Sequence, residues 1–129
     1  MAAINNISNL PNLKTVSIAG CPKVTTLSIT NCPNLTSIEI NLEQLNTLVI
    51  NNCPKLTNLI ISKCGSTLSR LNLEGCTSLG RINFDNATYT ALTYLNLRNT
   101  IVSTIKWGTT LNSDYLDLYN MPNLDEIII

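Results

Sequence analysis

PKVTTLSITNC, from Pro22 to Cys32, is the stretch of sequence that decides the fold. Its pattern, P-x-L-x-x-L-x-I-x-N-C, also starts at Pro11, Pro33 and Pro54, and it continues in weaker form toward the C-terminus. We number the three apolar residues of the pattern one, four and six, so that the cysteine occupies position nine. A short pattern that recurs at a nearly fixed period indicates a repeat architecture, in which successive units stack on one another.

Two apolar positions recur along the chain at short and nearly constant intervals. Position six is held by Ile18, Ile29, Ile40, Ile50, Ile61, Leu73, Phe84, Leu97, Trp107, Leu118 and Ile129. Position four is held by Val16, Leu27, Ile38, Leu48, Leu59, Leu71, Ile82, Leu95, Ile105, Leu116 and Ile127. Because polar residues stand between them in most units, each unit is predicted to be a short strand with one buried face.

The end of each unit has the composition of a turn. Position eight is mostly Asn or Gly, which tolerate the left-handed backbone conformation that a tight turn requires. These residues are Gly20, Asn31, Asn52, Gly75, Asn86 and Asn120. In several units a Cys-Pro pair follows, and the residue before a proline favours an extended conformation. The pattern therefore predicts a turn after every strand.

One unit is too short to be a complete coil, since solenoid coils of this kind commonly need about 20 residues or more. Pairing the units gives coils of sufficient length, each with two strands on opposite faces. We therefore predict a single, mainly β domain over residues 1–129, in repeat register from about residue 10. The domain would be a solenoid of about five coils, with parallel strands and little or no helix.

Composition and charge argue against several classes of function. Eight Lys and Arg residues balance eight Asp and Glu residues, whereas nucleic acid and anionic lipid require a clustered basic excess. The chain has no histidine, which removes the usual general base and zinc ligand. No apolar run is long enough for a signal peptide or a membrane-spanning segment, so membrane insertion is not expected. The location of the protein stays open, with the cell surface or secretion among the options.

The cysteines point to packing rather than to chemistry. All five occupy position nine, where other units carry Leu, Ala, Thr or Met, so we expect buried thiols. The cysteines are Cys21, Cys32, Cys53, Cys64 and Cys76. Neither a disulfide framework nor a zinc site fits this spacing. Of the candidate carboxylates Asp85, Asp114 and Asp117, no pair is singled out by spacing. We therefore predict a protein that is not an enzyme, with no catalytic residues, metal or cofactor.

The repeat resembles the leucine-rich repeat family, whose signature is L-x-x-L-x-L-x-x-N/C. The run from Leu27 to Cys32 carries the resemblance, as do the runs from Leu48 to Cys53 and from Leu71 to Cys76. The resemblance covers about residues 10–129 and is nearest to the short bacterial repeats, with two half-repeats in each coil. The convex helix of the longer classes is missing. The resemblance implies a binding scaffold, usually for protein, with contact to a host or a cell surface among its settings. We expect a peptide or glycan partner less than a protein.

One face of the predicted solenoid is chemically rich near the C-terminus. We count the units from the one that contains Ile18. The interval from an even-numbered unit to the next unit is nearly constant, whereas the interval from an odd-numbered unit varies. In leucine-rich repeats the concave strand and its following turn keep a constant length, so the resemblance assigns the even-numbered units to the concave sheet. The outward residues of its last three strands would stack as a three-by-three grid, which we predict to bind a partner. The grid is Arg70, Asn72, Glu74, Tyr94, Asn96, Arg98, Tyr115, Asp117 and Tyr119. Tyr and Arg dominate the energetics of many interfaces, but the same residues can also stabilise a solvated sheet by pairing with one another.

The C-terminal edge suggests an alternative function. The last unit stops at position six, so Ile127 and Ile129 would stand on an open apolar strand, which invites pairing with another strand. An array also needs polar caps at its ends to stay soluble. The alternative is therefore a structural subunit of a filament, virion or surface layer, or a homo-oligomer, joined through these edges.

Overall fold

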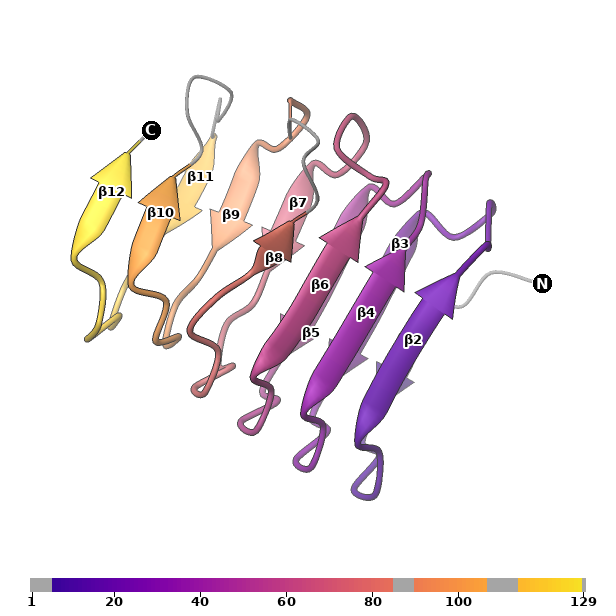
Figure 1. Cartoon of the computed structure of the whole chain (residues 1–129), viewed down its shortest axis with the longest axis horizontal. Helices are drawn as coiled ribbons and strands as arrows, with labels where there is room; N and C mark the ends of the chain where they lie inside the picture. The colour runs from indigo at the N-terminus through magenta and orange to yellow at the C-terminus, as the bar shows by residue number, and fades with distance from the viewer. Residues whose placement is uncertain (1–5, 85–89, 107–113, 129) are drawn as a thin grey trace.

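The protein is a β-solenoid of about five turns, with parallel strands throughout (Figure 1). A computed structural model describes residues 6–84, 90–106 and 114–128, and these ranges contain strands and turns but no helix. Successive strands alternate between two sides of the molecule, so that two units complete each turn. The predicted fold class is confirmed.

The strands of the even-numbered units, preceded by β1, form one continuous six-stranded sheet. Its members in order are β1 (Asn6–Ser8), β3 (Thr26–Thr30), β5 (Thr47–Asn51), β7 (Arg70–Asn72), β9 (Tyr94–Asn96) and β11 (Tyr115–Asp117). Pairing between β1 and β3 sets Ile7 opposite Ile29, so the repeat register begins earlier than residue 10.

The odd-numbered units form the opposite side, which is divided into two sheets. The four-stranded sheet holds β2 (Thr15–Ala19), β4 (Ser37–Asn41), β6 (Asn58–Ser62) and β8 (Asn83–Phe84). The two-stranded sheet holds β10 (Thr104–Lys106) and β12 (Glu126–Ile128). Among the described residues, no pairing joins β8 to β10. The chain between β8 and β9 is also longer than the corresponding connections of earlier turns.

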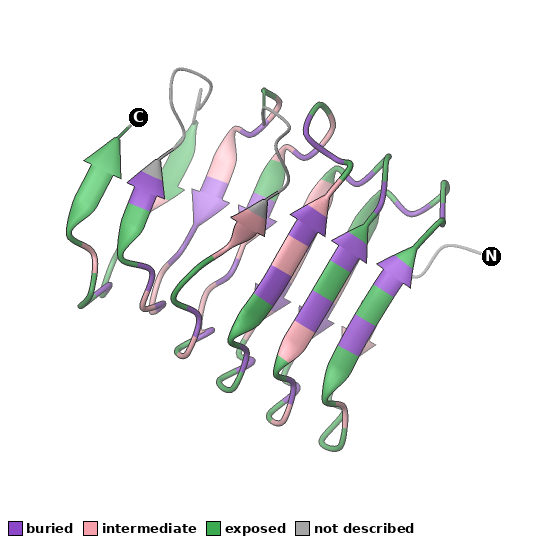
Figure 2. Cartoon of the chain, viewed as in Figure 1, coloured by how far each residue is buried: buried purple, intermediate pink, exposed green. Residues whose placement is uncertain are grey.

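The core lies between the two sides and is built from repeat positions one, four, six and nine. Leu27 and Ile29 of β3 are fully buried, and so are Leu59 and Ile61 of β6 on the other side. Buried residues alternate with exposed or half-buried ones along β2, β4 and β6 (Figure 2). Period-two burial is the geometry that a pleated strand imposes, because successive side chains point to opposite faces.

The turns repeat one hydrogen bond. The backbone N–H of position one donates to the carbonyl oxygen of position nine, as from Leu35 to Cys32 (3.3 Å) and from Leu56 to Cys53 (3.2 Å). Proline often fills the second place of such a turn, where its fixed φ suits the geometry. Position eight has positive φ at Gly20, Asn31, Asn52, Gly75 and Asn120, as the composition predicts. Lys63 also adopts positive φ (75°), which the sequence does not signal.

Two sets of sequence expectations concern residues at the start of the repeat or outside the described ranges. Position nine is buried at every cysteine, but its equivalent Leu10 in the first unit is 43% exposed, because no earlier turn of the described chain covers it. Asp85, Asn86, Tyr89, Trp107 and Ile129 lie outside the described residues.

Candidate functional site

The nine side chains of the predicted grid come from three neighbouring strands and the residues that follow them. Strand β9 lies between β7 and β11, and the register sets Tyr94 opposite both Arg70 and Tyr115. Asn96 lies opposite Asn72 and Asp117 in the same way. Positions three and five of the grid therefore lie side by side on the sheet. The position-seven residues Glu74, Arg98 and Tyr119 were expected on the same strands, but they lie in the turns that follow them.

The row at position three is a stack of planar groups. The rings of Tyr94 and Tyr115 lie 4.3 Å apart between centroids, with an interplanar angle of 6°. On the other side of Tyr94, the guanidinium carbon of Arg70 lies 4.0 Å from the ring centroid. A cation placed over an aromatic face is attracted by the ring quadrupole. The row is thus a continuous column that holds both rings in one orientation.

The row at position seven is ionic and aromatic. Arg98 Nε lies 3.9 Å from Glu74 Oε1, and Arg98 Nη1 lies 3.6 Å from Asp117 Oδ2. The guanidinium carbon of Arg98 also lies 4.3 Å from the ring centroid of Tyr119. Since these groups are partly exposed, the ion pairs add little stability, but together they restrict the orientation of the Arg98 side chain.

The row at position five ends the strands. The side-chain oxygens of Asn72, Asn96 and Asp117 accept hydrogen bonds from the backbone N–H two residues later, at 3.1, 2.9 and 2.9 Å. This local bond competes with the sheet ladder, and β7, β9 and β11 end at these three residues. In β3 and β5 the same position is Ser28 or Val49, and those strands continue for two more residues. Asn or Asp at position five is the sequence signal for this early ending.

The centre of the grid is buried and its C-terminal margin is open. Asn96 is 3% exposed, and its Nδ2 donates to Glu74 Oε2 at 3.2 Å. Tyr115 is 42% exposed and Tyr119 is 62% exposed. The Tyr115 hydroxyl donates to Asp117 Oδ2 at 3.2 Å. Desolvation and the neighbouring Asp117 carboxylate raise the pKa of the Tyr115 phenol.

The cysteines lie apart from the grid, inside the core. All five are buried, and none is joined in a disulfide. Burial raises the pKa of the Cys76 thiol to about 12, and the pKa of Cys53 is also raised. Cys76 Sγ donates to the carbonyl oxygen of Ile50 at 3.1 Å. Thiols in this environment are poor nucleophiles, because the thiolate is the reactive form.

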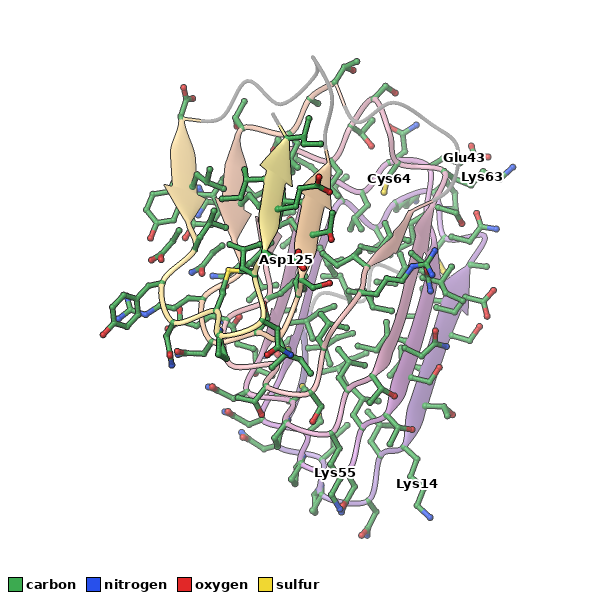
Figure 3. The ribbon with its side chains drawn as sticks, turned by 60° about the vertical axis from the view of Figure 1, so that its left-hand side comes forward. Lys14, Glu43, Lys55, Lys63, Cys64 and Asp125 are labelled. Carbon is green, nitrogen blue, oxygen red and sulfur yellow. The ribbon has the colours of Figure 1, made fainter. Side chains whose placement is uncertain are left out.

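The charged side chains outside the grid are spread over both edges of the solenoid. Lys14 and Lys55 lie at one edge, and Glu43 and Lys63 lie at the other (Figure 3). Glu43 and Lys63 line a hollow of about 350 Å³ together with Gly20, Cys21, Pro22 and Asn41. Among the described residues, no group of three or more His, Cys, Asp or Glu side chains is arranged to hold a metal ion. In the same part of the chain, no helix is long and apolar enough to cross a membrane.

Comparison with known proteins gives no relative: no family model, no curated protein and no solved structure matches the chain.

Proposed function

We propose that the chain is a non-catalytic scaffold of leucine-rich-repeat type that binds a protein partner through its six-stranded sheet. The contact surface is the nine-residue grid on β7, β9 and β11, and this sheet corresponds to the concave one of the family. The observation that carries the proposal is the mutual anchoring of Arg70, Tyr94 and Tyr115 in one stacked column. Side chains that are already ordered lose less entropy when a partner docks, so more of the contact energy appears as affinity.

The exposure of the grid supports the same assignment. Tyr115 and Tyr119 present rings at the open margin, while Arg98 and Asp117 provide a donor and an acceptor beside them. Rigid aromatic rings next to charged groups are typical of the residues that dominate binding energy. The absence of histidine from the sequence supports the non-catalytic part of the proposal.

The test starts with affinity capture from the source organism, followed by binding measurements on the purified partner. Changing Tyr94, Tyr115 and Tyr119 together to Ser should weaken binding by more than about tenfold, since a single hot-spot truncation can cost about 2 kcal/mol. The matched control changes Thr26, Ser28 and Thr30 of β3 to Ala, on the same sheet but away from the grid. Circular dichroism checks that both variants fold.

Tyr119→Ser alone is a milder probe, because Tyr119 is the most exposed ring of the grid. If the folded triple variant binds the partner as tightly as the unchanged chain, the grid is a solvated ladder and the proposal is wrong. If both variants lose binding equally, the contact lies elsewhere on the sheet.

A second candidate function is end-to-end assembly with further copies of the chain. It is favoured by the exposure of Leu116 (39%) and Ile127 (49%), which hold the position that is buried in earlier units. Both lie on outer strands, since β11 is the last strand of the six-stranded sheet and β12 is the last of the two-stranded one. A parallel strand of another copy, such as β1, would continue the same ladder.

A further inference from the structure

A groove runs along the edge where the six-stranded sheet turns toward the opposite side, the lower edge in Figure 1. It consists of two adjoining hollows of about 430 and 510 Å³. Both hollows are lined by Asn52 and Gly75, so they form one depression that crosses several turns of the solenoid. We call it the turn groove. It is distinct from the grid, which lies on the face of the sheet.

One wall of the turn groove is a row of carboxamides. Asn31, Asn52, Asn99 and Asn120 all hold position eight with φ between 54° and 61°. Because their backbone conformations match, their side chains recur at the spacing of the stacked strands, about 4.8 Å. Asn120 Nδ2 donates to Asn99 Oδ1 at 2.8 Å, which joins two members of the row directly.

Gly75 leaves a gap in this row. It holds the same position with φ of 81°, and a Cβ atom there would collide with Asn52 Oδ1. The Asn52 oxygen thus occupies the space beside the missing side chain, where it can accept a hydrogen bond. On the far side of the gap, Asn99 keeps two N–H donors after its oxygen has accepted from Asn120. The gap therefore lies between the Asn52 oxygen, which can accept a hydrogen bond, and Asn99, whose amide can donate one.

The lining of the turn groove indicates a neutral ligand. Its residues are Asn, Pro, Gly, Thr and Ile, and none carries a charge. Lys55 lies at this edge next to Pro54, but its Nζ donates to Asn34 Oδ1 at 3.0 Å. Carboxamides can both donate and accept, which suits hydroxyl groups. The rings of Pro33, Pro54 and Pro122 offer apolar surface for the C–H faces of a sugar.

The spacing of the row separates a glycan from an extended peptide. Side chains on one face of an extended peptide repeat about every 6.6 Å, which is out of step with carboxamides about 4.8 Å apart. A β-1,4-linked pyranose chain advances by close to one strand spacing for each ring, so successive rings would lie opposite Asn31, Asn52, the gap at Gly75, Asn99 and Asn120. We propose that the turn groove binds a neutral, linear, β-1,4-linked glycan, with a hydroxyl group seated in the gap at Gly75.

The experiment measures binding of cellohexaose and chitohexaose to the full chain by isothermal titration calorimetry. Saturable binding of at least one hexasaccharide is expected, with the trisaccharide of the same series weaker. Gly75→Asn should reduce the affinity at least about tenfold, because the new side chain fills the gap. Gly20→Asn is the matched control, since Gly20 holds the same position with φ of 65° on the opposite edge and has open space around it.

A second pair of variants keeps the test valid if Gly75→Asn does not fold. Asn99→Gly removes the carboxamide without strain at positive φ, whereas Asn9→Gly makes the same change at an asparagine outside the groove. Loss of binding in Asn99→Gly and not in Asn9→Gly supports the proposal. The proposal is overturned if neither hexasaccharide binds, if all four variants bind like the unchanged chain, or if a proline-rich peptide binds in place of the glycans.

Discussion

Gly20 and Gly75 occupy the same repeat position on opposite edges of the solenoid, but their surroundings differ. Both have positive φ, which a residue with a Cβ atom adopts only at a cost of about 1–2 kcal/mol. A Cβ atom on Gly20 would meet no atom within 4 Å. On Gly75 it would collide with Asn52 Oδ1 and press against the backbone N of Asn52 at 3.3 Å. Glycine is therefore favoured at residue 75 for two reasons and at residue 20 for one, the positive φ, which Asn and Lys also adopt at this position in other units.

Gly75→Ala should lower the free energy of unfolding by more than about 2 kcal/mol, and Gly20→Ala by about 1 kcal/mol. Urea-induced unfolding followed by circular dichroism measures both changes. Equal losses in the two variants would mean that Asn52 moves aside at no cost, and that the crowding at Gly75 has no energetic weight.

The buried thiols give the protein a pH dependence at high pH. The pKa of Cys76 is about 12 in the folded chain, against 9.0 for a thiol that is not buried. Between these values the unfolded chain has lost the proton and the folded chain retains it, so folding binds a proton and stability falls as the pH rises. Below about pH 9.0 both states are protonated, and the contribution of Cys76 is complete.

We predict that stability is constant near neutral pH and falls above about pH 9, by up to about 1.4 kcal/mol per pH unit from Cys76. Cys76→Ala should reduce this slope, because the unfolded chain then has one fewer thiol to ionise. The measurement is urea unfolding at several pH values in the presence of reductant. If stability falls with pH equally steeply in the unchanged chain and in Cys76→Ala, the raised pKa of Cys76 is not the cause of the fall.

At the scale of elements, the ends of β7, β9 and β11 are set by side chains at position five. Asn96 is the central case, because its oxygen accepts from the Arg98 N–H and its amide donates to Glu74 while the side chain is almost fully buried. Removing the Asn96 side chain leaves the Arg98 N–H without its acceptor, which costs about 1–3 kcal/mol. Glu74 loses less, because it is partly exposed and keeps its ion pair with Arg98.

Asn96→Ala should therefore lower the free energy of unfolding by about 1–3 kcal/mol. Ser28→Ala, at the same repeat position in β3, should cost less than about 0.5 kcal/mol, as is usual for a surface change away from such contacts. Thermal unfolding of the two variants compares them directly. If Asn96→Ala loses no more stability than Ser28→Ala, the hydrogen bonds of the position-five side chains do not stabilise the ends of these strands.

At the scale of the whole molecule, the two sides of the solenoid lose burial toward β11 and β12. Strand β12 is exposed along its whole length, including Ile127 and Ile128 (Figure 2). In the middle of the array, the equivalent residues of β6 are buried or half-buried, because strands cover them on both sides. Loss of burial at an inward position leaves apolar area that association with a second copy would remove from water.

The chain should therefore form larger species as its concentration rises, as measured by light scattering after size-exclusion chromatography. Ile127→Lys should shift the equilibrium toward the monomer, because a charge on the outer strand opposes edge pairing. Asn58→Lys, on the exposed face of β6, is the control and should leave association unchanged. A monomer at every concentration would remove the basis for the assembly proposal.

Much of the grid was accessible from the sequence because repeat proteins convert sequence spacing into spatial stacking. Residues at the same repeat position two units apart become cross-strand neighbours, so the sequence alone pairs Tyr94 with Tyr115. The spacing does not report side-chain orientation. Whether Arg98 turns toward Glu74, Asp117 or Tyr119 depends on contacts among all four residues, and the structure brings it near all three.

By itself, the sequence determined the solenoid, its parallel strands, the buried positions and the residues of the grid. It could do so because each unit carries apolar residues at positions four and six, and stacking of successive units buries all of them in one continuous core. Only the tertiary structure decided the division of the odd-numbered side and the turn groove at Gly75. These features depend on local hydrogen bonds and on the absence of a single side chain, which a repeat pattern averages out.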